Sequence, residues 1–323
     1  IRAAIVNSGF KFPAKRITIN LVPAGTKKEG THFDLPIAVG IMISIELIRT
    51  VRTSEFAFLG ELSLDGSVNR INGALPLVIG LRKQGIKKIM LPAANAEEAS
   101  AVDDILLYPV RNLWELAAYF EGGYEIEPYQ RNRGVISRPS EQETDFRDVA
   151  GQETVKRALQ VAAAASHNVL LIGPPGAGKT MMAKRTAGIL PVMTYEEKLE
   201  VTKIYSVAGE LTDNRPMIET RPFRSPHHTL SGAALVGGGS SPKPGEVSLA
   251  HFGVLFLDEL PEFKRNVLEM LRQPLEDERV TISRVRGSTT FPANFMLLAS
   301  MNPCPCGYYG DSTRECTCTP NQI

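Results

Sequence analysis

The spacing of apolar residues in the first 120 or so positions predicts a small α/β domain. Alternating apolar residues predict a strand over Ile17–Leu21, and a long apolar stretch over Leu35–Ile48 predicts a buried helix. Residues 56–68 predict a β-hairpin that turns at Asp65-Gly66. The other elements expected in this block are helices over residues 75–84, 96–102 and 112–119 and a strand over residues 88–91.

A polar, turn-rich segment separates this block from the rest of the chain. Residues 125–145 are rich in Glu, Arg and Pro and have no apolar period, which is typical of a linker. Beyond it, helical segments alternate with apolar, β-rich segments, which predicts a parallel sheet covered by helices. We therefore expect a domain of residues 1–123, a linker of residues 124–145 and a second domain of residues 146–323.

The composition fits a protein of two ordinary globular domains, with 323 residues, of which 43% are hydrophobic and 22% charged. A formal net charge of +1 excludes a global basic field, so nucleic acid would be contacted by a local patch or by several subunits together. No apolar run reaches the length of a membrane span, and the first residues do not form a signal peptide. Because all four cysteines cluster near the C-terminus, we expect a cytoplasmic protein with reduced thiols or a metal site.

A glycine-rich segment, residues 173–180, fits the pattern G-x-x-x-x-G-K-[ST] of a phosphate-binding loop (P-loop). An apolar strand over residues 168–172 precedes it and a helix over residues 181–190 follows, so a chance glycine turn is the weaker interpretation. Backbone N–H groups and the helix N-terminus would face phosphates, with Lys179 on the β and γ oxygens and Thr180 on Mg²⁺. The residues expected to bind ATP here are Gly173, Pro174, Pro175, Gly176, Ala177, Gly178, Lys179, Thr180 and Met181.

Polar side chains follow two further apolar strands. Asp258 and Glu259 end the strand that begins at Val254, where Asp258 would hold Mg²⁺ and Glu259 would polarise the attacking water. Asn302 ends the strand that begins at Phe295, where its amide would hydrogen-bond the γ-phosphate or the water. The alternative for the acidic pair alone is a solvated strand end, and the alternative for Asn302 alone is an ordinary turn residue. Together with the P-loop, they predict a site that hydrolyses ATP.

These motifs occur in the order seen in AAA+ ATPases, beginning with residues 148–152. Three longer segments, residues 223–229, 244–251 and 271–276, resemble the magnesium-chelatase-like family, in its YifB/ComM branch. The resemblance implies that Asn302 is the sensor-1 residue and that Val149 and Gln152 lie near the adenine. It also implies self-assembly into a ring, usually a hexamer, with ATP between subunits.

The first block is similar to the proteolytic domain of Lon in residues 60–66 and 85–92. That protease uses a Ser–Lys dyad, whose serine position falls near Thr31-His32-Phe33 and whose lysine position falls near Leu77. Neither a serine nor a lysine is found there, and a nucleophile needs an activating base. We therefore expect a Lon-like fold without peptidase activity.

Three functions are compatible with this resemblance. The first is a DNA-remodelling motor of the branch-migration helicase type, and the second is a chelatase-type ATPase subunit that remodels a protein partner. The third, a Lon-like protease, is disfavoured by the missing dyad. Sequence-independent DNA contacts are a hypothesis, against the alternative of ordinary surface loops, for Arg224, His227, His228, Lys243 and the segment 284–287.

The cysteines form the pattern C-x-C, nine residues, C-x-C. Four thiolates complete a tetrahedral zinc site and leave no open position, so such a zinc would be structural. The alternative is four reduced thiols in a loop. The residues concerned are Cys304, Cys306, Cys316 and Cys318.

The resemblance also implies a helical lid with a sensor-2 arginine, and an arginine finger that acts on a neighbouring subunit. The chain ends at Ile323, so the lid is expected to be absent from it, and neither arginine can be assigned. Arg272 is a further arginine of interest, but the sequence gives no geometry from which to assign it as the arginine finger. We expect this chain to bind nucleotide but to turn it over poorly.

Overall fold

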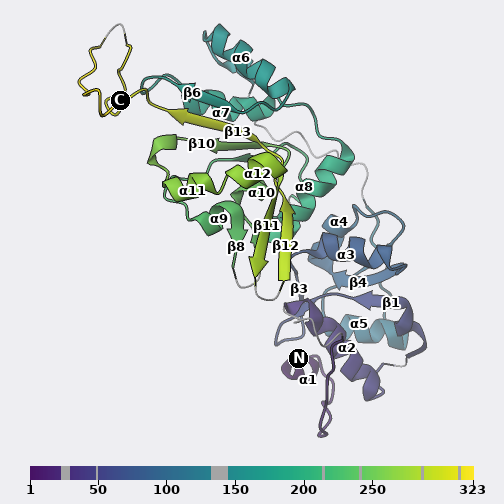
Figure 1. The fold of residues 1–323 in the computed structure, drawn as a ribbon. Helices are drawn as coiled ribbons and strands as arrows, with labels where there is room; N and C mark the ends of the chain where they lie inside the picture. The colour runs from purple at the N-terminus through teal and green to yellow at the C-terminus, as the bar shows by residue number, and fades with distance from the viewer. Residues whose placement is uncertain are drawn as a thin grey trace. The chain divides into compact units, whose positions relative to one another are not determined.

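The computed structural model describes residues 1–22, 30–48, 50–131, 145–212, 215–239, 242–284, 287–311 and 314–323. The chain forms two compact units (Figure 1). The first unit comprises Ile1–Gly134 and Tyr205–Met217, and the second comprises Val135–Ile204 and Ile218–Ile323. The predicted linker lies mostly in residues 132–144, outside the described part of the chain.

The first unit contains a three-stranded parallel sheet of order β1-β4-β5, between two layers of helices (Figure 1). Helices α2 and α5 pack their apolar residues against Met90 of β4, and α3 and α4 lie on the other face. The elements of this unit are α1 (Arg2–Asn7), α2 (Asp34–Ser44), β1 (Phe56–Phe58), β2 (Glu61–Leu62), β3 (Val68–Asn69), α3 (Ala74–Lys83), β4 (Lys88–Pro92), α4 (Ala96–Ala99), β5 (Leu106–Val110) and α5 (Leu113–Glu121).

The structure confirms the buried helix, as α2, and the turn at Asp65-Gly66, which joins β2 to β3. The hairpin is shorter than predicted, because Phe56–Phe58 forms β1 and pairs with β4 in the parallel sheet. The predicted strand over Ile17–Leu21 is wrong. No described residue pairs with this segment, and its Ile19 and Leu21 side chains are exposed. Alternation of apolar residues indicates a strand only where a partner strand and a core are available. Strand β5, which no prediction included, completes the sheet.

The segment Tyr205–Met217 belongs to the first unit, although the sequence placed it in the second domain. Helix α8 (Tyr195–Ala208) is divided between the units: its residues up to Ile204 belong to the second unit, and Tyr205 begins the segment that belongs to the first. The Ser206 hydroxyl donates a hydrogen bond of 2.9 Å to the carboxylate of Glu98, which is 3% exposed. Glu98 also accepts from Arg70 at 2.8 Å and from the Leu75 N–H at 3.2 Å. These donors compensate the burial of a charge, which is otherwise costly.

The second unit is built on a four-stranded parallel sheet of order β6-β13-β10-β7. Helices α6 and α7 cover one face and form a core with Phe256 and Leu298, while α10 and α12 lie on the other face (Figure 1). This confirms the predicted parallel, helix-covered sheet. The elements concerned are α6 (Glu153–Ala164), β6 (Val169–Ile172), α7 (Lys179–Gly188), β7 (Phe223–Arg224), α10 (Glu246–Leu249), β10 (Val254–Leu257), α12 (Arg272–Asp277) and β13 (Met296–Met301).

The remaining elements are short or lie beside this sheet. An antiparallel hairpin joins β11 to β12, and β8 pairs with β9. No helix in the described ranges is long and apolar enough to cross a membrane. The bounds are α9 (Gly232–Val236), β8 (Gly237–Gly238), β9 (Lys243–Pro244), α11 (Arg265–Glu269), β11 (Arg279–Arg284) and β12 (Gly287–Pro292), with 3-10 helices at Thr31–Phe33, Thr50–Glu55, Ala93–Asn95, Phe146–Asp148 and Leu260–Glu262.

Candidate functional site

The carboxyl ends of β6, β13 and β10 bring the predicted site residues together. Strand β13 lies between the other two, with Met301 beside Ile172 and Ala299 beside Leu257. All strands of this sheet are parallel, so the P-loop, Asn302 and the acidic pair Asp258-Glu259 follow them at one edge. Such an edge is where open α/β sheets bind their ligands.

The P-loop turns sharply between β6 and α7. Gly176 and Gly178 have φ angles of 80° and 82°, a region that favours glycine. Helix α7 begins at Lys179, whose ammonium donates to the carbonyl oxygens of Gly173 at 2.7 Å and Pro174 at 3.0 Å. It also donates to Oδ1 of Asn302 at 3.0 Å. The lysine and the predicted sensor residue are therefore direct neighbours.

A second set of contacts joins Thr180 to the acidic strand end. The Thr180 hydroxyl donates to Oδ2 of Asp258 at 2.6 Å, and the Ser300 hydroxyl donates to Oδ1 of the same carboxylate. A hydroxyl and a carboxylate side by side are the oxygen ligands that Mg²⁺ prefers, so these residues fit the ion. The sequence analysis missed Ser300. Its signal is a polar residue, with no exposed surface, inside the apolar strand β13.

Glu259 turns away from the sheet and faces a cavity. Its backbone is left-handed, with a φ angle of 54°, and its side chain is 62% exposed. The cavity has a volume of about 480 Å³, and its lining includes Glu259, Asn302, Cys304 and His228. Nδ1 of His228 lies 3.8 Å from Oε2 of Glu259. The predicted water-activating carboxylate therefore borders a space next to Asn302.

The two residues expected near the adenine occupy different environments. Val149 is buried in the core that also contains Leu159 and Met182. Gln152 is exposed, with a left-handed φ angle of 58°, and directly precedes α6. Their contact with adenine stays a prediction.

The residues considered for DNA contact differ in their surroundings, as far as the structure describes them. Arg224 pairs with Glu246 through two hydrogen bonds of 2.7 and 2.8 Å, so its guanidinium is held within the unit. His227 contacts the Thr229 hydroxyl at 3.0 Å. Lys243 is exposed in β9. The hairpin candidate, residues 284–287, has residues 285 and 286 outside the described ranges.

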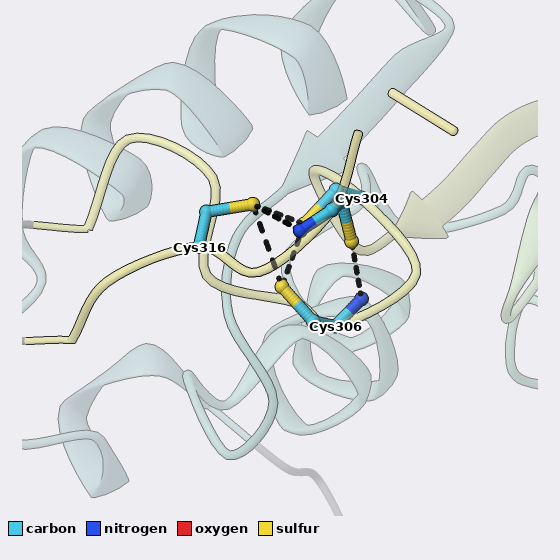
Figure 2. Close-up of side chains that lie close together, drawn as sticks. Cys304, Cys306 and Cys316 are labelled. Atoms are coloured by element: carbon cyan, nitrogen blue, oxygen red, sulfur yellow. Dashed lines mark hydrogen bonds between the residues drawn. The ribbon is translucent and has the colours of Figure 1, made fainter. Parts of the chain in front are cut away.

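The Sγ atoms of the four cysteines lie close together, and Figure 2 shows three of these residues, Cys304, Cys306 and Cys316. All four Sγ atoms lie within 4.8 Å of one another, and those of Cys304, Cys306 and Cys316 are separated by 3.3, 3.5 and 3.7 Å. Tetrahedral zinc with Zn–S bonds of about 2.3 Å places its sulfurs about 3.8 Å apart. The N–H groups of Tyr309 and Cys306 donate to Sγ of Cys304 and Cys318, at 3.3 and 3.4 Å.

The backbone around this cluster favours a thiolate. Hydrogen bonds from the backbone of Tyr308, and then of Thr317, lower the pKa of Cys306 to about 6. The pKa of Cys316 is instead raised to about 12: the Cys318 N–H lowers it, but burial and the neighbouring thiols raise it by more. The donor set, its separations and its polar environment all fit a zinc ion.

Comparison with known proteins identifies the family. The family described as magnesium chelatase, subunit ChlI, matches residues 145–323, and the family described as subunit ChlI of Mg-chelatase matches residues 1–95. The chain is 44% identical to the uncharacterized protein YifB of Salmonella typhimurium, over 98% of this chain and 62% of that protein. It is also 44% identical to the competence protein ComM of Haemophilus influenzae, over 100% of this chain and 63% of that protein.

Lon protease 2 of Bacillus subtilis is 30% identical over 50% of this chain and 31% of its own length. This similarity accords with the predicted Lon-like first domain. The chain spans about 62% of the length of YifB. It belongs to the magnesium-chelatase-like family, together with YifB and ComM, and has that family's AAA+ ATPase fold behind a Lon-like N-terminal domain.

Proposed function

We propose that the protein binds and hydrolyses ATP with Mg²⁺ at the edge formed by β6, β13 and β10. The observation that carries this proposal is the pair of contacts Lys179–Asn302 and Thr180–Asp258. They unite residues from three separate strand ends in the arrangement that phosphoryl transfer requires.

Each residue has a distinct role in the proposed reaction. The P-loop backbone and Lys179 bind the phosphates, and Thr180 and Asp258 hold Mg²⁺. When bound by Thr180 and Asp258, Mg²⁺ would neutralise charge that develops on the phosphate oxygens. Glu259 orients and polarises the attacking water from the cavity side, and Asn302 donates its amide N–H to the γ-phosphate or orients the same water.

We further propose that ATP turnover in a ring, a hexamer by family resemblance, drives remodelling of DNA. This part of the proposal rests on the family resemblance, within which the chain is 44% identical to the competence protein ComM. The pairing of Arg224 with Glu246 argues against a direct DNA contact by that arginine. The alternative is a chelatase-type subunit that remodels a protein partner, which the name of the matching family favours. In either case, the Ser–Lys dyad is missing at Thr31 and Leu77, so no peptidase activity is proposed.

We also propose that Cys304, Cys306, Cys316 and Cys318 hold a structural Zn²⁺, because their sulfurs already approach tetrahedral separations. Zinc would act here as a cross-link of the loop and not as a catalyst, since four thiolates leave no open ligand position.

The rate of ATP hydrolysis by the full-length protein, with and without forked or four-way DNA, tests this function. Stimulation by DNA, abolished in Lys179→Ala, is the expected result. A rate that responds to a protein partner and not to DNA would favour the chelatase-type alternative. Absence of ATP binding would contradict the proposal altogether.

A further inference from the structure

The cysteine loop, described over residues 303–311 and 314–318, begins directly after Asn302 and touches the P-loop. Gly307 has a φ angle of +83°, and a Cβ atom built on it would lie only 2.6 Å from Cδ and 2.9 Å from Cγ of Pro175. Real Cβ atoms essentially never approach another heavy atom so closely. The backbone of the cysteine loop therefore packs directly on the ring of the second proline in the P-loop.

This loop has little hydrophobic packing to hold it in place. Among the described residues after Asn302, only Cys304 and Gly307 are buried. Its described internal contacts include the thiol cluster and turn hydrogen bonds, such as Gly307 N–H to the Cys304 carbonyl at 2.9 Å. The Arg314 guanidinium also donates to the Tyr308 hydroxyl at 2.9 Å and lies over its ring. A segment without a core of its own needs a cross-link to keep one conformation.

Two residues of the cysteine loop, Cys304 and Gly307, lie next to the proposed nucleotide site. Cys304 is two residues from Asn302, whose amide oxygen accepts from Lys179, and Cys304 itself lines the cavity faced by Glu259. Gly307, three residues further, abuts Pro175. The cysteine loop thus connects Asn302, which accepts from Lys179, with Pro175 of the P-loop.

We propose that Zn²⁺ bound by the four cysteines clamps this loop against Pro175, and that metal occupancy thereby sets the affinity of the P-loop for ATP. This inference rests on the proposed function, because it concerns regulation of the same ATP site. Zinc lowers the number of conformations open to the loop, so ATP binds to a site whose wall is already ordered. By thermodynamic reciprocity, bound ATP must increase the affinity for zinc by the same factor by which bound zinc increases the affinity for ATP.

Two glycines of the same loop provide a matched test. Gly307 and Gly310 both have left-handed φ angles, +83° and +78°, but a Cβ on Gly310 would meet nothing within 4 Å. Gly307→Ala and Gly310→Ala therefore introduce similar backbone strain, and only the first disturbs the contact with Pro175. Zinc content and the Kd for a fluorescent ATP analogue are measured on the full-length wild type and both variants.

We expect both variants to hold one zinc per chain, Gly310→Ala to bind the analogue within about twofold of wild type, and Gly307→Ala to bind it roughly fivefold or more weakly. Adding Pro175→Ala to Gly307→Ala makes room for the new methyl group and is expected to recover part of the affinity. Equal affinities in Gly307→Ala and Gly310→Ala would overturn the clamp.

A second measurement reports on coupling without any substitution in the loop. The rate of zinc transfer to a chromophoric chelator is followed with and without ATP, in wild type and in Lys179→Ala. We expect ATP to slow transfer in wild type only. Two results would contradict the clamp and leave the proposed function intact. One is a wild-type protein that binds ATP but holds no zinc, and the other is a rate of zinc transfer that ATP does not change. A protein that holds zinc but binds no ATP refutes both.

Discussion

The ammonium of Lys179 donates a hydrogen bond of 3.0 Å to the amide oxygen of Asn302, which lies 123 residues further along the chain. The same ammonium is held by two carbonyl oxygens of the P-loop. The lysine that would bind the phosphates and the amide that would sense them are therefore parts of one hydrogen-bond network. A change in either residue should affect the other.

Substitution Asn302→Ala should separate binding from hydrolysis. It removes one polar group beside the site of charge development but leaves the P-loop backbone and Thr180 in place, so we expect ATP to bind with nearly normal affinity. The turnover rate should fall by about 100-fold, a typical effect of losing one such donor. Equilibrium binding of an ATP analogue and steady-state phosphate release by the full-length protein measure the two effects. Weaker binding with an unchanged turnover rate at saturating ATP would assign Asn302 to binding alone.

Ser300 should act through Asp258, to which it donates a hydrogen bond. Removing a hydrogen bond to a metal-binding carboxylate weakens metal affinity by about 10- to 100-fold, so Ser300→Ala should require that much more Mg²⁺ for nucleotide binding. Ser248→Ala is the matched control, because Ser248 is equally buried and its hydroxyl has no hydrogen-bond partner in the described part of the chain. A Mg²⁺ titration that gives the same midpoint for both variants would exclude a positioning role for Ser300.

Glu98 should contribute strongly to the stability of the first unit. Its buried carboxylate accepts from Arg70, Leu75 and Ser206, and Glu98→Ala leaves the Arg70 charge without this partner. Arg70 is 25% exposed and keeps a hydrogen bond to the Ala94 carbonyl, so the cost should fall below the roughly 3–5 kcal/mol of a fully buried pair but exceed that of Ser206→Ala. Ser206→Ala removes one hydrogen bond to a charged group and should cost about 1.5–3 kcal/mol. Urea unfolding curves that show less loss for Glu98→Ala than for Ser206→Ala would disagree with this interpretation.

His251 should make the second unit less stable in weak acid. Burial, followed by the charge of Lys203, lowers its pKa from 6.5 to about 4, although Glu197 opposes the shift. Nδ1 accepts the Asn294 N–H at 3.0 Å, and Nε2 lies 3.6 Å from a carboxylate oxygen of Glu200. Because the folded pKa is the lower one, the unfolded chain binds the proton first as the pH falls below 6.5. The associated stability is present above pH 6.5 and is lost toward pH 4.

The loss attributable to His251 should reach roughly 2 kcal/mol by pH 5. His251→Asn keeps an acceptor near the Asn294 N–H but cannot titrate. We therefore expect its free energy of unfolding to change less between pH 7.5 and pH 5 than that of the wild type. The same pH dependence in both proteins would show that His251 is protonated as readily in the folded state as in the unfolded chain, and would contradict the lowered pKa.

The nucleotide site could be predicted because its signals are local. A P-loop between a strand and a helix, and polar residues at the ends of apolar strands, predict which side chains meet at one edge of a parallel sheet. Which site residues contact one another was harder to predict from the sequence. That Ser300 faces Asp258 depends on the register of β13 beside β10, which no single segment encodes.

The same limit explains what the sequence analysis missed or misplaced. Ile17–Leu21 has the pattern of a strand, but strand formation depends on a partner elsewhere in the fold. Tyr205–Met217 returns to the first unit, where Ser206 meets the buried Glu98, a long-range contact without a local signature. The cysteine spacing indicated a metal site, whereas the close approach of Gly307 to Pro175 appeared only in three dimensions.

The most direct test of the central claim compares ATP binding and hydrolysis in three forms of the full-length protein. Lys179→Ala should lose measurable binding of Mg²⁺-ATP, because the ammonium that binds the phosphates is gone. Glu259→Gln should bind Mg²⁺-ATP as the wild type does but hydrolyse it about 100-fold or more slowly, because the amide cannot activate water. Undiminished hydrolysis in Glu259→Gln, or normal binding in Lys179→Ala, would contradict the assignment of this edge of the sheet as the ATPase site.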